Sequence, residues 1–308
     1  MTAFARAPRL GPLMTAMLTP FDSADRVDLA EAKRLARFLI DEGNDGLVVC
    51  GTTGEAPALT EREQLALLEA VKSEVGDRAG IVAGTGSNST AHTIAFTKEA
   101  AAVGVDAALV VVPYYNKPTQ DGMLAHFGAV AQATNLPIII YNIPGRTAAN
   151  MLPATLLELA RRHRTIAGVK ESTADCAQFT AILRDRPPDF AFWSGDDYMF
   201  LPALALGGDG LIGVASHLCA RELREMIDAF AAGDSARAAH IHRDLAPLFS
   251  ALFATSSPIP VKWAMNELGF SLGPCRTPLG TLPPELADRL RPLLESYRTR
   301  CAAVAALR

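Results

Sequence analysis

Short apolar runs recur along the first two thirds of the chain, and each is followed by a segment in which apolar residues have helical spacing. Continuous apolar runs of this length are typical of parallel strands that are covered on both faces. Strands are predicted at 12–19, 46–50, 81–83, 106–112, 137–141, 165–170, 190–194 and 210–214. Helices are predicted after the first seven strands, at 29–42, 61–75, 89–103, 120–134, 153–162, 174–185 and 197–206.

Repeated strand–helix units in this order favour a (β/α)8 TIM barrel, within the α/β class. A doubly wound open sheet is the competing fold, but it calls for a Gly-x-Gly-x-x-Gly turn after an early strand, which this sequence lacks. From about residue 218 the pattern is purely helical, with helices predicted at 222–232, 235–253, 259–268 and 284–297. We therefore expect a catalytic barrel in residues 1–218 and a C-terminal helical domain in residues 219–308.

Composition narrows the choice of partners. The 308 residues are 49% hydrophobic and carry a net charge of −4, with a pI of about 5.9, so neither nucleic acid nor an anionic membrane is an expected partner. Five cysteines without a Cys-x-x-Cys spacing favour a reducing compartment, with neither disulfides nor zinc. No apolar run is long enough for a signal peptide or a membrane span, so a cytoplasmic protein is expected. We predict neither a metal nor a cofactor.

In a barrel of this kind, chemistry gathers at the carboxyl ends of the strands. Lys170 ends the predicted sixth strand, and it is the one lysine that we expect to point toward the interior; the other five lie in polar, helical or loop segments. Burial disfavours the ammonium form and lowers the pKa, and a neutral amine is the nucleophile that forms a Schiff base with a carbonyl. The alternative is a lysine that extends out of the strand end into solvent.

Three further strand ends carry polar groups. The turn at 51–55, Gly-Thr-Thr-Gly-Glu, offers backbone N–H groups to a carboxylate or phosphate. Tyr141 could shuttle protons, and Arg146 could bind an anionic group through its planar fork. Each has an alternative without chemistry. The segment 51–55 could be an ordinary turn, Tyr141 could be a tyrosine at the barrel mouth whose hydroxyl is already hydrogen-bonded, and Arg146 could form a surface ion pair. Asp196 and Asp197 are expected to open a helix as caps rather than to bind a cation.

Taken together, these motifs resemble the dihydrodipicolinate synthase family of Schiff-base pyruvate lyases, which includes N-acetylneuraminate lyase. The resemblance runs from about Met14 to Leu294. The matching motifs are Gly-Thr-Thr-Gly-Glu at 51–55, Ala-Gly-Thr-Gly at 83–86, Pro-Tyr-Tyr-Asn-Lys-Pro at 113–118, Tyr-Asn-Ile-Pro-Gly-Arg-Thr at 141–147, Gly-Val-Lys-Glu at 168–171, Ser-Gly-Asp-Asp at 194–197 and Pro-Ile-Pro-Val-Lys at 258–262.

The resemblance implies a role for each matching residue. Lys170 would form the imine with pyruvate, and the backbone of Thr52 and Thr53 would hold the pyruvate carboxylate. Tyr141 would relay protons, linked through Thr52 to Tyr115, a tyrosine that family members lend to the neighbouring subunit. The resemblance thus implies a homo-oligomer, most simply a tetramer built from two tight dimers.

For the second substrate, the resemblance implies that Arg146 receives the carboxylate of L-aspartate 4-semialdehyde, while the backbones of Gly195 and Ile212 line the pocket. The reaction implied is the condensation that yields 4-hydroxy-tetrahydrodipicolinate, early in lysine and diaminopimelate biosynthesis. The alternative is another class I pyruvate aldolase, acting on 4-hydroxy-2-oxoglutarate or a sugar acid, and such relatives usually lack an arginine at this position. A non-catalytic barrel scaffold is the alternative of a different class, and the presence of Lys170, Tyr141 and Thr52 together argues against it.

The resemblance also bears on inhibition by L-lysine. Asn88 and Tyr114 match the inhibitor site of lysine-sensitive relatives, but His92 stands where they carry a glutamate. Two further positions, Ala56 and Gln64, also depart from the usual residues. Loss of a carboxylate that faces the ligand's ammonium predicts weak inhibition, unless a neighbouring acid such as Glu55 or Glu61 restores the contact.

Overall fold

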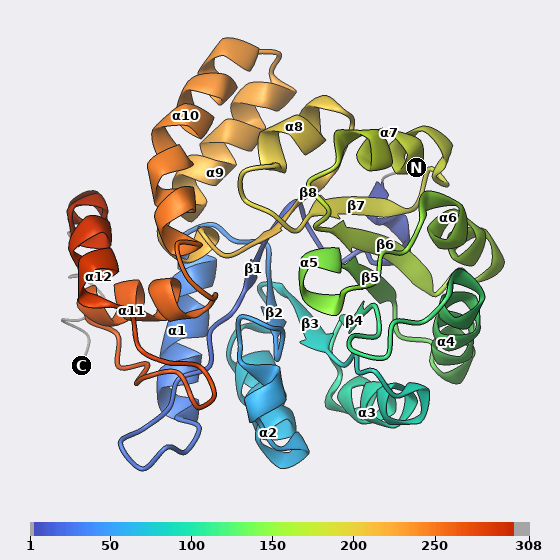
Figure 1. The fold of residues 1–308 in the computed structure, drawn as a ribbon, viewed down its shortest axis with the longest axis horizontal. Coiled ribbons are helices and arrows are strands. Elements are labelled where there is room, and N and C mark those ends of the chain that lie inside the picture. Colours follow the sequence, from blue (N-terminus) through green and yellow to red (C-terminus); the bar gives the residue numbers. More distant parts are fainter. Residues whose placement is uncertain (1–2, 299–308) are drawn as a thin grey trace.

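The computed structural model describes residues 3–298, in which eight parallel strands close into a barrel surrounded by helices (Figure 1). Each strand pairs with its neighbours in the sequence, and β8 pairs with β1 to close the sheet. The strands are β1 (Leu13–Ala16), β2 (Gly46–Val49), β3 (Gly80–Gly84), β4 (Ala107–Val111), β5 (Ile138–Asn142), β6 (Ile166–Glu171), β7 (Ala191–Ser194) and β8 (Gly210–Gly213). The predicted TIM barrel is confirmed.

Helices alternate with the strands, and all except the short fifth helix, which lies over the barrel, form the outer ring (Figure 1). The helices are α1 (Leu29–Asp41), α2 (Glu61–Val75), α3 (Thr90–Val103), α4 (Gln120–Ala133), the short α5 (Pro144–Thr147), α6 (Pro153–Arg162), α7 (Cys176–Asp185) and α8 (Phe200–Ala205). The predicted bounds of α2 and α6 coincide with those observed. At α2 the Thr60 side chain accepts from the Glu63 N–H while the Glu63 side chain accepts from the Thr60 N–H, so this capping box fixes where the helix begins.

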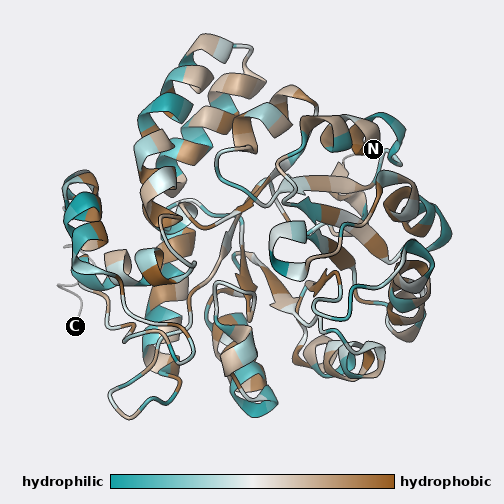
Figure 2. Cartoon of the chain, viewed as in Figure 1, coloured by the Kyte–Doolittle hydropathy of each residue, from teal (hydrophilic) through white to brown (hydrophobic). Residues whose placement is uncertain are grey.

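The hydrophobic core has one cluster inside the barrel and two between the sheet and the helices. Apolar residues accordingly gather on the strands and on the inward faces of the helices (Figure 2). Trp193 is fully buried in the inner cluster and donates from Nε1 to the Gly11 carbonyl at 3.0 Å. A side chain at Gly168 would come within 2.7 Å of that indole, so glycine makes room for it. The inside of the barrel is therefore packed, and space for a ligand lies at its mouth.

The C-terminal helices pack on one side of the barrel, beside α1 and α8 (Figure 1). They are α9 (Ser216–Ala231), α10 (Ser235–Leu252), α11 (Ile259–Glu267) and α12 (Pro284–Leu290). The first of them, α9, begins directly after β8 and packs against β1, and α10 packs on α9. Helix α9 therefore runs across the predicted boundary at residue 218. The division into a barrel and a helical domain stays a prediction.

Some predicted helices differ from those observed. The last was predicted at 284–297, but α12 ends at Leu290 and a 3₁₀ turn, Arg291–Leu294, follows. Pro292 lies in that turn and has no N–H to donate, which explains the break. Among residues 3–298 no helix combines the length and apolar character that a membrane span requires.

Candidate active site

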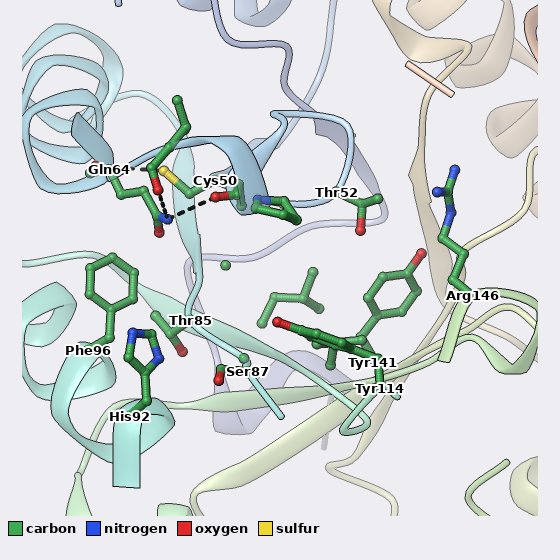
Figure 3. A pocket seen from close by; sticks show the side chains of 18 of the residues that line it. Cys50, Thr52, Gln64, Thr85, Ser87, His92, Phe96, Tyr114, Tyr141 and Arg146 are labelled. Carbon is green, nitrogen blue, oxygen red and sulfur yellow. Dashed lines mark hydrogen bonds between the residues drawn. The ribbon is translucent and has the colours of Figure 1, made fainter. Parts of the chain in front are cut away.

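Two adjoining cavities open at the carboxyl ends of the strands. The first, which we call the Lys170 cavity, has a volume of about 250 Å³. The second, the His92 cavity, has a volume of about 580 Å³ (Figure 3). Thr52, Tyr141 and Arg146 line both cavities, so a ligand bound in either one would meet these three side chains.

Lys170 lies near the end of β6 with 5% of its surface exposed. The pKa of its amine is lowered to about 8, mainly by burial; the negative charge of Asp197 opposes this shift and the positive charge of Arg146 adds to it. Its Nζ lies 4.3 Å from the centre of the Tyr141 ring and points into the Lys170 cavity. A large fraction of this amine is therefore neutral near pH 8, as a carbonyl nucleophile must be.

Tyr141 lies on β5 directly beside Lys170, since the two residues are register partners across the β5–β6 pair. Burial raises the pKa of the phenol to about 12, and the positive charge of Arg146 opposes this rise. The phenol thus keeps its proton at neutral pH, and it adjoins the amine that would receive or release protons during imine chemistry.

The turn after β2 presents free backbone donors. Within the described residues, no hydrogen bond occupies the N–H groups of Thr52 or Thr53, and both residues line the Lys170 cavity. A hydrogen bond from another segment holds the turn in place, because Thr19 donates from Oγ1 to the Gly54 carbonyl at 2.6 Å. Two adjacent free N–H groups at a cavity wall are suited to a carboxylate.

Arg146 follows a Pro-Gly pair that is typical of a turn, but it lies in the short helix α5. Its guanidinium donates to the Ser257 carbonyl at 3.3 Å, and in the part of the chain that the structure describes it makes no ion pair. The alternative of a surface ion pair is therefore not what the structure shows. With its charge uncompensated at the rim of both cavities, Arg146 can accept an anionic group.

Gly195 and Ile212 lie at different depths. Gly195 lines the Lys170 cavity, and a Cβ there would lie 2.9 Å from Lys170 Cε and 2.0 Å from Ser172 Oγ, so the position requires glycine. Ile212 is fully buried on β8 and lines neither cavity, whereas Val214, two residues later, lines the Lys170 cavity.

Tyr115 stands apart from the other predicted site residues. Its side chain is 88% exposed, its backbone φ of +73° is left-handed, and it lines neither cavity. Among the described residues, no hydrogen bond joins it to Thr52 or joins Thr52 to Tyr141. The neighbouring Tyr114 does line the His92 cavity. A single chain thus leaves Tyr115 extended toward solvent.

One polar residue of the site, Ser172, was missed in the sequence, and another, Asp197, was given a different role. Ser172 follows Lys170 by two positions, so it faces the same side of the strand, and it lines the Lys170 cavity. Asp197, predicted as a helix cap, is buried instead and accepts from the N–H groups of Val214 and Ala215 at 3.3 Å. Burial raises the pKa of this carboxyl to about 7. Strand alternation could have revealed Ser172, whereas the burial of Asp197 had no local signal.

The expectation that Lys170 alone points inward is wrong. Lys262 is 1% exposed, less than Lys170, although it was predicted, with four other lysines, to lie in a polar, helical or loop segment rather than to point inward. It lines neither cavity and donates from Nζ to Glu55 Oε1 at 2.6 Å. A carboxylate partner compensates its charge, which explains how a lysine on a helix can be buried.

Of the residues named for lysine inhibition, Ala56, Gln64, His92 and Tyr114 line the His92 cavity, whereas Asn88 does not. His92 Nε2 lies 2.8 Å from Glu61 Oε1, with both side chains about half exposed. Gln64 donates from Nε2 to the Ala56 carbonyl at 3.1 Å, which holds the segment after the Gly51–Glu55 turn (Figure 3). A carboxylate therefore lies next to His92, although no carboxylate stands at position 92.

Comparison with known proteins agrees with this geometry. The sequence model of the dihydrodipicolinate synthetase family matches residues 9–297. A protein of Moorella thermoacetica named 4-hydroxy-tetrahydrodipicolinate synthase is 54% identical over 87% of this chain and 92% of its own. A protein of the same name from Listeria welshimeri is 50% identical over 93% of this chain and 98% of its own.

Solved structures give the same result. Dihydrodipicolinate synthase from Bacillus anthracis superposes with a TM-score of 0.91 at 42% identity, covering 96% of this chain and 99% of its own. The enzyme from Cyanidioschyzon merolae, solved with lysine bound, superposes with a TM-score of 0.91 at 41% identity over 100% of both chains. The family predicted from the motifs is thereby confirmed: this chain belongs to the dihydrodipicolinate synthetase family.

Proposed function

We propose that this chain is a lyase that condenses pyruvate with L-aspartate 4-semialdehyde, as a 4-hydroxy-tetrahydrodipicolinate synthase. Its relatives at 48–54% identity carry that name over most of the chain, in agreement with the function predicted from the sequence. The observation that carries the proposal within the site is the buried Lys170 amine beside the Tyr141 phenol, in a cavity walled by the free N–H groups of Thr52 and Thr53.

Each step uses a group that lies at the cavity. The Lys170 amine attacks the ketone carbon of pyruvate, whose carboxylate binds the Thr52 and Thr53 N–H groups. The carbinolamine loses water to give a protonated imine, with Tyr141 passing protons to and from the oxygen. The imine is an electron sink, so the pyruvate methyl group loses a proton and becomes an enamine carbon.

The second substrate enters through the rim. Arg146 binds its carboxylate, and the enamine carbon attacks the aldehyde carbon to form the new C–C bond. The substrate's own amine then attacks the imine carbon, which closes the ring and releases Lys170 as a free amine. All atoms of both substrates remain in the product apart from the water lost on imine formation, so the reaction needs no redox partner.

Arg146 favours this substrate over those of sibling aldolases. Sugar-acid aldolases accept a chain of hydroxyl groups, which calls for hydrogen-bonding side chains rather than an uncompensated guanidinium. An aldolase for 4-hydroxy-2-oxoglutarate is the alternative, because its substrate also carries a second carboxylate. We further propose a cytoplasmic homotetramer in which Tyr115 reaches a neighbouring active site. A monomeric variant is known among the solved relatives, at 35% identity, so assembly needs its own test.

A direct assay tests the function. The protein is supplied with pyruvate and aspartate semialdehyde, and the product is consumed by a reductase that oxidises a nicotinamide cofactor, whose absorbance is recorded. We expect turnover that requires both substrates. Turnover with 4-hydroxy-2-oxoglutarate or a sugar acid, and none with the semialdehyde, would assign the chain to a sibling activity.

A further inference from the structure

The second buried lysine, Lys262, belongs to a cluster of charged residues beneath the Thr52–Thr53 turn. It lies on α11, and both partners of its ion pair with Glu55 are buried, with side-chain exposures of 1% and 0%. Its Nζ also lies 4.0 Å from the centre of the Phe21 ring. A helix of the C-terminal region is thus joined to the loop after β2 by a desolvated charge pair.

Glu55 is held at both carboxylate oxygens by this region. Oε1 accepts from Lys262, and Oε2 accepts from the backbone N–H of Arg276 at 2.8 Å. The Arg276 guanidinium covers the Phe21 ring at 4.3 Å and binds Glu63 at 2.6 Å, on the first turn of α2. The Glu55 carboxylate therefore has one fixed position.

The backbone of Glu55 links its fixed carboxylate to the conformation of the Thr52–Thr53 turn. Glu55 has a left-handed φ of +57°, and its N–H donates to the Thr52 carbonyl at 3.0 Å, which closes the turn that carries the Thr52 and Thr53 N–H groups. A left-handed conformation is costly for a residue with a Cβ, so it persists where surrounding contacts impose it. The two contacts to its carboxylate act here together with the Ala58 N–H, which donates to the Glu55 carbonyl at 2.8 Å.

We propose that Glu55 and Lys262 are positioning residues, whose buried ion pair aims the Thr52 and Thr53 N–H groups at the carboxylate of pyruvate. The proposal rests on the proposed function, since it assigns these N–H groups to that carboxylate. A role in stability alone is the competing explanation. Buried ion pairs are a weak source of stability, because desolvation offsets much of the attraction, but they fix geometry through directional contacts.

The test replaces the pair without leaving a lone buried charge, in the variant Glu55→Gln/Lys262→Met. Its matched control is Arg6→Met/Asp189→Asn, which removes an ion pair of similar burial, 6% and 7% exposed, near the start of β6 and away from both cavities. For each protein we would measure the melting temperature, the KM for pyruvate and for the semialdehyde, and the rate at which borohydride traps pyruvate on Lys170.

We expect the Glu55/Lys262 variant to raise the pyruvate KM and slow trapping by about tenfold to a hundredfold, the loss typical of misplaced binding groups. Its KM for the semialdehyde should stay within about threefold of wild type. The control pair should lower the melting temperature and leave the pyruvate KM unchanged. A wild-type pyruvate KM in the Glu55/Lys262 variant, or equal changes in both KM values, would overturn the proposal.

Two further measurements keep the result decisive. If the double variant does not fold, Glu55→Gln/Lys262→Gln is used, since a pair of amides also leaves no lone buried charge and can still accept from the Arg276 N–H, and a KM split in the same direction is expected. Trapping needs only pyruvate, so wild-type protein that traps pyruvate but does not turn over the semialdehyde would refute the proposed function while leaving the positioning role testable. Wild-type protein that traps no pyruvate would refute both.

Discussion

Lys170 and Tyr141 face each other across the β5–β6 pair, with the lysine Nζ 4.3 Å from the centre of the phenol ring. The same burial acts on them in opposite directions, because it disfavours the charged form of each: the amine pKa falls to about 8 and the phenol pKa rises to about 12. At neutral pH the pair therefore holds a partly neutral nucleophile and a protonated acid.

A pH profile follows from these values. Imine formation requires the neutral amine, whose fraction falls about tenfold per pH unit below its pKa. We expect kcat/KM for pyruvate to rise with pH up to about 8 and then to level off. Loss of the Tyr141 proton should not reduce it until far higher pH. A profile that keeps rising toward the usual lysine value of 10.5 would contradict the lowered pKa.

Reductive trapping distinguishes the two buried lysines. Borohydride in the presence of pyruvate should fix a three-carbon adduct on Lys170 and none on Lys262, because the ion pair with Glu55 holds the Lys262 Nζ in a buried position outside both cavities. Peptide mapping by mass spectrometry gives the answer. Lys170→Ala and Lys170→Arg should both lose most activity, the latter because a guanidinium stays protonated. An adduct on another lysine would overturn the assignment.

Arg146→Ala should separate the two half-reactions. We expect the variant still to trap pyruvate on Lys170 and to have a raised KM for the semialdehyde, equivalent to about 1.5–3 kcal/mol for one charge-assisted contact. Arg146→Lys is the matched control, which keeps the charge but loses the planar fork and should give an intermediate KM. An unchanged semialdehyde KM in Arg146→Ala would favour a sibling activity.

Tyr115 offers a test of assembly. Its side chain is 88% exposed and held on a left-handed backbone, as a residue that inserts into a partner would be. Tyr115→Phe and Lys170→Ala should each be nearly inactive, and mixed subunits should regain activity, since one site of each hybrid dimer has both groups intact. A wild-type monomer with full activity in analytical ultracentrifugation would contradict this.

Inhibition by L-lysine is expected to be weak. Position 92 carries an imidazole rather than a carboxylate, a change worth about 1.5–3 kcal/mol in affinity for an ammonium. The Glu61 carboxylate, 2.8 Å from His92 Nε2, is the group that could compensate. Lysine is titrated into the coupled assay with wild type and Glu61→Gln. Half-inhibition of wild type below about 1 mM, abolished in Glu61→Gln, would show that Glu61 replaces the missing carboxylate.

Local sequence patterns were sufficient to predict the barrel and the position of some residues of the candidate site. Apolar runs and capping residues are local features, so the strands and α2 could be predicted from them. The buried position of Lys170 could be predicted because this lysine directly follows an apolar run within one strand. The burial of Lys262 could not, since it depends on Glu55, 207 positions away in the sequence.

Long-range contacts also explain the other differences. Arg146 reads as a loop residue, but α5 and the Ser257 carbonyl fix its direction. Asp197 reads as a helix cap, but the end of β8 supplies its partners. In each case the decisive neighbour lies on another element, and periodicity within one segment carries no information about it.

The stretch from Ser257 to Lys262 contacts the Arg146 guanidinium with its first residue and Glu55 with its last. The helices after the barrel are therefore not an exchangeable module. A chimera that joined this barrel to the C-terminal region of a distant relative would have to preserve both contacts, or lose the alignment of one substrate's binding groups with the other's. In this chain, the barrel and its C-terminal helices would therefore have to be inherited together for both contacts to be kept.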